Sequence, residues 1–332
     1  MTGDELRAVV LTPPPLPLPL IDRFLYERCV MMITGETGKG KSIISAQIGL
    51  SCSLPSPLFG QLAIATPRRV YFMQCEGSVE AQLRRLHFMQ QAVGWNPDWL
   101  YWDARKADRL NVLSSASCKR KLEQIGNAFK EGVPDIVEID PIYKVCGGDL
   151  AKAEPALALI EFCDELLARF KCAVVLIHHP HRDRQDQQGR KLMEDDSYYG
   201  HSFLKNHVEA SYAFHQLPDE LTSQLRLLKK REDNMLPLLT LCYHPETYTV
   251  SMAPLDAPQS LKAQVEAYLY QLALAKQTTT FKEIVSKVGI SRQFLRDLQA
   301  DYRQQGIVDF HAFTGKSTIW EPKLPQQVPQ HG

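Results

Sequence analysis

The chain has 332 residues, which allows roughly two domains and a large buried core. Lys plus Arg number 38 and Asp plus Glu number 38, so no overall positive charge draws the protein onto nucleic acid, and any such contact must use local charge on loops or in a channel. No apolar run reaches the ~18 residues of a membrane span, and the first residues lack the basic and apolar regions of a signal peptide, so we expect a cytoplasmic protein without membrane contact.

The eight cysteines form no Cys-x-x-Cys pair and have no regular spacing. Most lie in apolar stretches, among them Cys75, Cys163, Cys172 and Cys242. We therefore expect reduced, buried thiols and neither a disulfide framework nor a zinc site.

Residues 1–20 contain five prolines between Pro13 and Pro19 and predict a stiff, extended lead-in. From residue 21 to residue 252, short apolar segments alternate with longer amphipathic ones. This alternation predicts an α/β fold with a mainly parallel central sheet, because nearly continuous apolar strands suit a sheet covered on both faces. The predicted central strands are Val30–Thr34, Val70–Gln74, Ile136–Ile139 and Cys172–Ile177.

The clearest helical pattern runs from Pro155 to Phe170 and carries one apolar stripe. Pro155 fits the first turn of this helix. After residue 220 the pattern indicates strands only, which we expect to add antiparallel to one sheet edge. These strands are Gln224–Lys229, Leu238–Tyr243 and Thr247–Met252.

A small, different unit follows a predicted linker at residues 253–260. Residues 261–323 predict three helices and a hairpin, which is typical of a winged-helix domain, and residues 324–332 are an expected disordered tail. The helices are Leu261–Gln271, Phe281–Val288 and a third capped by Ser291 that runs to Gln304; the hairpin turns near Thr314–Lys316.

A phosphate-binding motif lies between a predicted strand and a predicted helix. Residues 35–42 read GETGKGKS and match G-x-x-x-x-G-K-[ST], with VMMIT before them and a helical pattern after them. Backbone N–H groups of such a loop cradle phosphates, the lysine reaches the β- and γ-phosphates, and the serine binds Mg²⁺. We therefore expect ATP and Mg²⁺ as ligands. The nucleotide-binding residues are Gly35, Glu36, Thr37, Gly38, Lys39, Gly40, Lys41, Ser42 and Ile43.

Acidic residues near the ends of two predicted strands complete this chemistry. Asp140 ends the strand in PDIVEIDP and is the expected partner of Ser42 in holding Mg²⁺, whereas Asp135 precedes that strand. Glu138 shares the face of Asp140 and is either part of the site or a buried or edge salt-bridge partner. Glu76 ends another strand and can face the γ-phosphate to orient water, or alternatively cap a helix.

Three histidines, His178, His179 and His181, follow the strand in CAVVLIHHPHR. No cysteine or further histidine lies nearby at the spacing of a zinc site. We therefore favour a polar sensor close to the γ-phosphate.

Five segments occur together in order: PLIDRFL…VMMITGETGKGKS, YFMQCEGSVEAQLRRL, PDIVEIDPI, VVLIHHPHR and LRLLKKRED. Over residues 15–252 they resemble the RecA-like hexameric ATPases of the RepA replicative helicase type, which are relatives of the DnaB-like helicases. The motif of residues 35–42 alone is generic. The series of Glu, Asp and His-His after successive strands, followed by K-x-R, is more specific.

The resemblance implies a RecA-like P-loop NTPase core and roles for particular residues. Glu76 would polarise the attacking water, Asp140 would hold magnesium, and His179 would sense the γ-phosphate. Lys229 and Arg231, two apart on a predicted strand and so on one face, would reach into the ATP site of a neighbouring subunit of a hexameric ring. Alternatively, this pair protects a sheet edge from aggregation.

The chain departs from the family pattern in two places. Glu76 is followed by Gly77 where the family often has Glu-Asp, which weakens any role for a second acid. Gly200 and Ser202 match the family's Gly-Ser-Ser loop only loosely.

Two long polar loops, residues 144–154 and 181–197, would line the channel of such a ring. The alternative is a solvated, mobile loop. In the small unit, the third helix presents arginines on one face and is either a DNA-reading helix or, with Asp297 and Asp301 beside them, a protein-docking surface. The basic residues concerned are Arg182, Arg184, Arg190 and Lys191 in the second loop, Arg292, Arg296 and Arg303 on the helix, and Lys316 in the hairpin.

These features together predict an ATP-hydrolysing hexameric helicase or translocase on single-stranded DNA, acting in replication of a plasmid, phage or mobile element. A loader, primase or initiator protein is an expected partner. The alternatives are a RecA-like ATPase that loads, remodels or regulates DNA-bound complexes without unwinding, and a DNA-binding regulator whose ATP site only switches assembly. A small-molecule kinase is disfavoured because it leaves Lys229 and Arg231 unexplained.

Overall fold

The computed structural model describes residues 17–104, 109–179, 202–217, 221–253, 265, 268–269, 272, 277–288, 290, 292–305, 308–312 and 318–322. The chain forms two compact units. One comprises Met1–Phe214, Leu227–Leu236 and His244–Ser251, and the other comprises His215–Arg226, Pro237–Tyr243 and Met252–Gly332.

A nine-stranded sheet has the order β11-β10-β9-β8-β3-β7-β6-β4-β5. Its six strands from β8 to β5 run parallel. β9 and β10 pair antiparallel near one edge, as predicted. The sheet confirms the expected α/β fold. Its strands are β3 (Val30–Gly35), β4 (Val70–Gln74), β5 (Leu100–Asp103), β6 (Ile136–Asp140), β7 (Ala173–His178), β8 (Ala210–Gln216), β9 (Thr222–Lys229), β10 (Leu238–His244) and β11 (Thr249–Met252).

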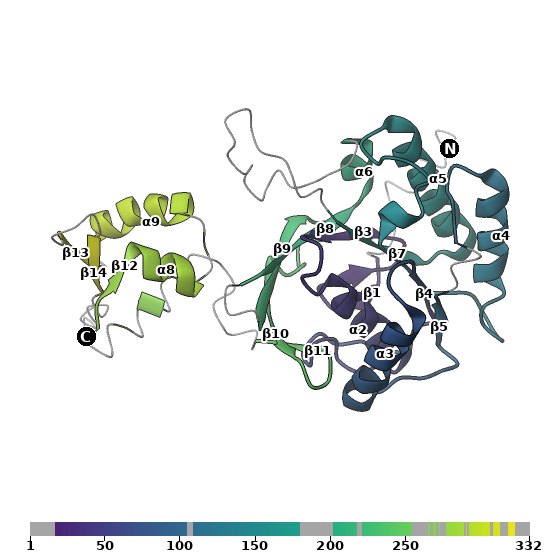
Figure 1. The fold of residues 1–332 in the computed structure, drawn as a ribbon, viewed down its shortest axis with the longest axis horizontal. Helices are drawn as coiled ribbons and strands as arrows, with labels where there is room; N and C mark the ends of the chain where they lie inside the picture. Colours follow the sequence, from purple (N-terminus) through teal and green to yellow (C-terminus); the bar gives the residue numbers. More distant parts are fainter. Residues whose placement is uncertain are drawn as a thin grey trace, which may run out of the picture. The chain divides into compact units, whose positions relative to one another are not determined.

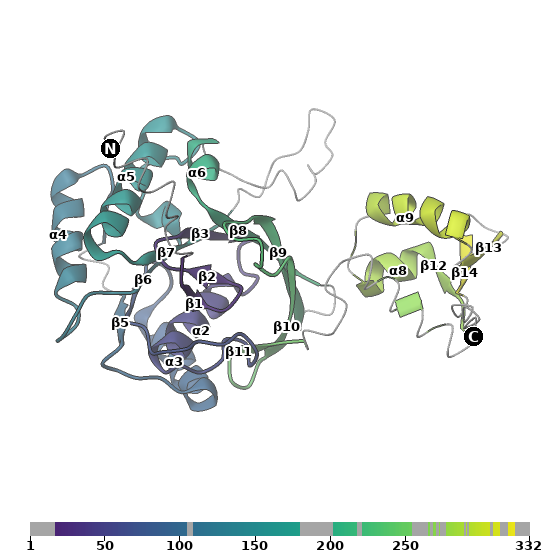
Figure 2. The same ribbon diagram turned by 180° about the vertical axis from the view of Figure 1, so that it is seen from behind.

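Helices cover both faces of the parallel strands (Figures 1 and 2). The α4 and α5 helices lie on one face, and α2 and α3 lie on the other. Alternate residues of the strands, such as Met32, Val137 and Leu176, join apolar residues of α4 and α5 in one core. The helices are α2 (Lys41–Ser53), α3 (Val79–Val93), α4 (Ser115–Gly126), α5 (Ala153–Phe170) and α6 (Ser202–His207), with a 3₁₀ turn η1 (Ile142–Lys144).

The four central strands, which are nearly continuous apolar runs, were predicted to within one residue at each end, whereas four other strands between residues 17 and 252 were missed. β5 and β8 were not predicted, nor were the two short strands β1 (Pro19–Ile21) and β2 (Leu25–Tyr26). Because β1 begins at Pro19 and its next two residues are buried, the extended lead-in predicted to reach residue 20 ends earlier.

One prediction about exposure held in part and another was wrong. The segment 144–154, predicted to be a polar loop, exposes residues 147–149 and 151–152 but is anchored in the core by Val145, Cys146 and Leu150. Cys242 is exposed because it occupies an outward position on β10, and Cys118 is only half-buried. The other six cysteines are buried, and all eight are free.

The C-terminal elements have their own core. They include α8 (Phe281–Val288), α9 (Arg292–Gln305) and a three-stranded sheet β12-β14-β13, formed by Thr279–Thr280, Thr318–Pro322 and Val308–Ala312. Ile284, Leu295, Tyr302 and Trp320 are buried there, together with Val265 from the first predicted helix. The winged-helix assignment stays a prediction. The linker from residue 254, most of 261–271, the turn at 313–317 and the tail from residue 323 lie outside the described residues.

Within the described residues, no helix is both long and apolar enough to traverse a lipid bilayer.

Candidate nucleotide-binding and hydrolysis site

The glycine-rich loop joins the carboxyl end of β3 to α2, as the motif predicts. Gly38 and Gly40 have φ angles of +77° and +107°, in the left-handed region that favours glycine. A Cβ at Gly35 would lie 2.5 Å from the carbonyl oxygen of Phe214 in the neighbouring β8. Residues 36–39 are exposed, so backbone N–H groups of the loop and of the first turn of α2 are available to an anion.

Lys41 opens α2 and folds back beneath the loop. Its Nζ donates a hydrogen bond to the carbonyl oxygen of Glu36 at 2.6 Å. Burial lowers the pKa of Lys41 to about 8, against the opposite influence of Asp140, Glu36 and Glu76. Its ammonium therefore lies inside the phosphate cradle, next to the carboxylates of the predicted site.

Asp140 lies at the end of β6 and is fully buried. It is hydrogen-bonded by Ser42 and by Gln74, whose Nε2 is 3.4 Å from Oδ2. Burial raises the pKa of Asp140 to about 6 despite these bonds and the charge of Lys41. Within the described structure, Oδ1 has no partner. A serine hydroxyl beside a buried carboxylate with a free oxygen fits Mg²⁺, which prefers oxygen ligands.

The two other acidic residues of the β6 segment, Asp135 and Glu138, accept hydrogen bonds from the protein itself. Asp135 accepts a hydrogen bond from the backbone N–H of Arg69 before the strand begins. Glu138 is fully buried and accepts a hydrogen bond from Ser45 Oγ at 2.6 Å. Burial raises the pKa of Glu138 to about 8, so it is mostly a neutral acid at pH 7. Within the described residues it pairs with no cation, so the salt-bridge interpretation was wrong, and instead it joins α2 to β6.

Glu76 follows β4 and meets two aromatic side chains, Tyr143 from the 3₁₀ turn η1 after β6 and His179 from directly after the end of β7. Tyr143 Oη donates to Glu76 Oε1 at 2.7 Å, and His179 Nε2 lies 3.6 Å from Oε2. Burial lowers the pKa of His179 to about 4, and nearby Lys41 acts in the same direction, so the ring is neutral at pH 7. The helix-cap interpretation of Glu76 was wrong, because Ser78 caps α3.

The sequence interpretation missed Tyr143 and Gln74. The available signal was position, since Gln74 ends β4 and Tyr143 comes three residues after Asp140. Of the other histidines, His178 is buried as the last residue of β7, and His181 lies outside the described residues.

Lys229 and Arg231 do not approach the chain's own phosphate loop. Arg231 lies beyond the end of β9, so the prediction that both residues occupy one strand was wrong. Lys229 Nζ donates to the carbonyl oxygen of Asn206 at 2.9 Å. Arg231 Nη1 donates to the carbonyl oxygen of Arg28 at 2.7 Å and to Glu209 Oε2 at 3.1 Å.

These contacts place the pair at the amino end of the parallel sheet. Arg28 precedes β3 and Glu209 precedes β8, whereas the phosphate loop follows the carboxyl end of β3. The six residues of β3 at ~3.3 Å each separate the two ends by about 20 Å. Within one chain, Lys229 and Arg231 and the predicted ATP site are therefore at opposite ends of β3.

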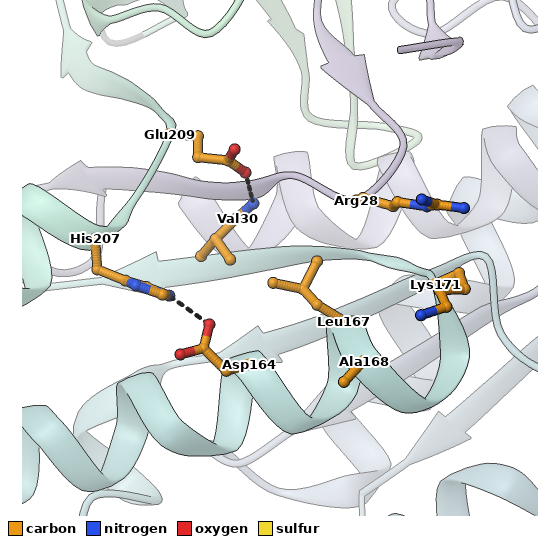
Figure 3. Close-up of a pocket in the computed structure, with 8 residues that line it drawn as sticks. All are labelled: Arg28, Val30, Asp164, Leu167, Ala168, Lys171, His207 and Glu209. Atoms are coloured by element: carbon orange, nitrogen blue, oxygen red, sulfur yellow. Dashed lines mark hydrogen bonds and ion pairs between the residues drawn. The ribbon is translucent and has the colours of Figure 1, made fainter. Parts of the chain in front are cut away.

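A pocket of ≈ 480 Å³ opens at this amino end, and its lining includes Arg28, Lys171 and His207. Figure 3 shows Glu209 directed at the backbone nitrogen of Val30, 3.1 Å away, and His207 directed at Asp164, 3.5 Å away. Both carboxylates are thus engaged by the protein itself.

The basic residues predicted to contact nucleic acid are only partly described. Arg292, Arg296 and Arg303 lie exposed on α9, as expected from their spacing. Arg182, Arg184, Arg190, Lys191, Lys316 and the loop residue Gly200 lie outside the described residues. Ser202 begins α6.

A phosphate cradle of this kind, on a parallel sheet between strand and helix, defines a P-loop nucleotide-binding protein. A family model described as an AAA domain matches residues 4–185, which is more than half of the chain. The protein belongs to this AAA-domain family of P-loop ATPases. No curated protein sequence matches it.

Among solved structures, the KaiC-like protein PH0186 from the hyperthermophilic archaeon Pyrococcus horikoshii OT3 is similar in fold. The match has 14% sequence identity and a TM-score of 0.47, and covers 71% of this chain and 94% of that chain. At this level the similarity carries no functional argument.

Proposed function

We propose that this protein is an ATP-hydrolysing, RecA-like helicase or translocase that forms a hexameric ring on single-stranded DNA and serves replication of a plasmid, phage or mobile element. The observation that carries the hydrolytic part is the cluster around Glu76. A carboxylate held by Tyr143 and His179, close to Lys41 and Asp140, is a water-orienting group that nucleotide binding alone does not need.

The residues divide the reaction between them. The loop N–H groups and Lys41 bind the phosphates, and Ser42 and Asp140 would hold Mg²⁺, which neutralises charge on the phosphate oxygens when bound. Glu76 takes the proton of the attacking water, and neutral His179 beside it reports on the γ-phosphate position. Orientation of the water by Glu76 should contribute about 10²–10⁴ in rate.

The ring part of the proposal is supported by the position of Arg231. Because the Arg231 side chain contacts the amino end of β3, about 20 Å of strand away from the end that carries the phosphate loop, it can serve an ATP site only in a second copy of the chain. A head-to-tail interface that closes would give a ring. The channel would be lined by residues 144–154 and 181–197, and the arginines of α9 would contact nucleic acid or a loader, primase or initiator.

Mixing two inactive variants tests the shared site. Glu76→Gln and Arg231→Ala should each lower ATP turnover, by about 10²-fold or more for a lost base or finger. In mixed assemblies about one quarter of the interfaces combine an intact Glu76 with an intact Arg231, so activity should reappear. Lys230→Ala is the matched control, because Lys230 is exposed and pairs with Asp233 instead.

Native mass with and without an ATP analogue, together with ATPase assays with and without single-stranded DNA, tests assembly and the DNA ligand. A hexamer with DNA-stimulated turnover supports the proposal. A monomer whose turnover ignores DNA, or a mixture that stays inactive, contradicts it. DNA-stimulated turnover without strand displacement identifies the alternative, an ATPase that loads or remodels.

A further inference from the structure

Glu76 has little to orient its side chain apart from Tyr143, which contacts Oε1, and His179, which lies farther away beside Oε2. It lies outside β4, its side chain is 40% exposed, and the next residue, Gly77, has a φ angle of +84°. An exposed glutamate that is free to rotate loses conformational entropy when it is ordered for catalysis. The 2.7 Å hydrogen bond from Tyr143 Oη restrains Oε1 before any nucleotide arrives.

The backbone around Tyr143 is well anchored, although its ring is not part of the core. Tyr143 is the middle residue of η1, directly after the segment of Asp140, and its neighbour Ile142 is fully buried. Val145 donates to the carbonyl oxygen of Ile142 at 3.0 Å and accepts from the backbone N–H of Val112 at 2.9 Å. Tyr143 itself is 39% exposed, so we expect removal of its hydroxyl to leave the fold intact.

We propose that Tyr143 is a positioning residue, which holds Glu76 Oε1 so that Oε2 faces the attacking water. The proposal deepens the hydrolytic function assigned to Glu76 and rests on it. As the water oxygen bonds to the γ-phosphorus and the bond from phosphorus to the bridging oxygen breaks, the water proton passes to Oε2, and ADP and phosphate leave. Oε2 is the oxygen that faces His179, which is neutral and does not compete as an ion-pair partner.

The phenol is suited to remain a donor throughout. Partial burial and the Glu76 carboxylate both raise the pKa of Tyr143, so the hydroxyl keeps its proton at every pH used for assay. The ring also packs 5.8 Å from that of His179, centroid to centroid, and Lys144 Nζ lies 4.9 Å from its centre. Tyr143→Phe keeps these ring contacts and removes only the hydrogen bond.

The test measures kcat and KM for ATP in the full-length protein. Tyr143→Phe should lower kcat by about tenfold and leave KM unchanged, because misplaced groups cost rate without altering phosphate binding. Tyr248→Phe is the matched control. The half-buried ring of Tyr248 packs near Phe88, and loss of its hydroxyl should change neither kcat nor KM.

A double-variant cycle separates positioning from a merely structural effect. In a Glu76→Gln background, followed by single-turnover hydrolysis, Tyr143→Phe should cause less than a twofold further loss. A wild-type kcat in Tyr143→Phe, a raised KM, or the same tenfold loss without Glu76 would overturn the inference. If Glu76→Gln itself retains wild-type turnover, the hydrolytic role of Glu76 in the proposed function fails. If Glu76→Gln loses turnover but Tyr143→Phe keeps the wild-type kcat, the inference about Tyr143 fails and the hydrolytic role of Glu76 stands.

Discussion

Replacing Lys121 by methionine tests whether a buried ion pair holds α4 against the edge of the sheet. Lys121 Nζ lies 2.8 Å from Asp103 Oδ2, and the side chains are only 3% and 2% exposed. At an effective dielectric of about 20, their attraction is about 6 kcal/mol, which offsets the cost of removing both charges from water. Lys121→Met leaves the carboxylate buried without its cation.

The expected loss of unfolding free energy is about 3–5 kcal/mol. Hydrogen bonds to Asp103 from Tyr71 Oη at 2.7 Å and Gln124 Nε2 at 3.3 Å remain and prevent a larger loss. Because a domain of this size shifts by about 2–4 °C for each kcal/mol, the melting temperature should fall by about 6–20 °C.

Urea unfolding followed by tryptophan fluorescence measures the change, and Trp102 adjoins Asp103 in β5. The control is Lys130→Met, which removes a pair with Asp98 whose side chains are 90% and 70% exposed, and should cost less than about 1 kcal/mol. A Lys121→Met protein as stable as the control would refute the reasoning.

Two further predictions follow from local geometry and burial. Gly35→Ala should lower stability by about 1–3 kcal/mol and weaken nucleotide binding, because its Cβ would meet the Phe214 carbonyl oxygen at 2.5 Å; thermal unfolding and titration with a fluorescent ATP analogue check both, and wild-type values in both would contradict it. Iodoacetamide at pH 8 should alkylate exposed Cys242 first, since burial raises the pKa of Cys146 to about 12 and keeps it a thiol. Peptide mapping by mass spectrometry reads the order, and early loss of the Cys146 thiol would argue against the described core.

The sequence alone determined those strands, helices and turns whose conformation depends only on residues close together in the chain. The strand Val70–Gln74 and the helix Phe281–Val288 were predicted with their observed bounds, because period and composition are set within a few residues. The P-loop was recognisable because only glycine readily adopts the left-handed angles at residues 38 and 40. Short β5 was missed because its apolar run, residues 99–102, is only four residues long and ends at the charged Asp103.

The tertiary structure decided how the site residues are grouped, because the order of the strands in the sheet depends on contacts between segments far apart in the sequence. The adjacency of β4, β6 and β7 brings Glu76, Tyr143 and His179 together, although more than a hundred residues separate the first from the last. Packing of α2 on β6 makes Glu138 a neutral acid, a state that the amino-acid type alone does not predict. The parallel arrangement likewise puts Arg231 at the opposite end of β3 from the phosphate loop. These outcomes depend on which distant segments pack together, because burial and proximity set both protonation and partners.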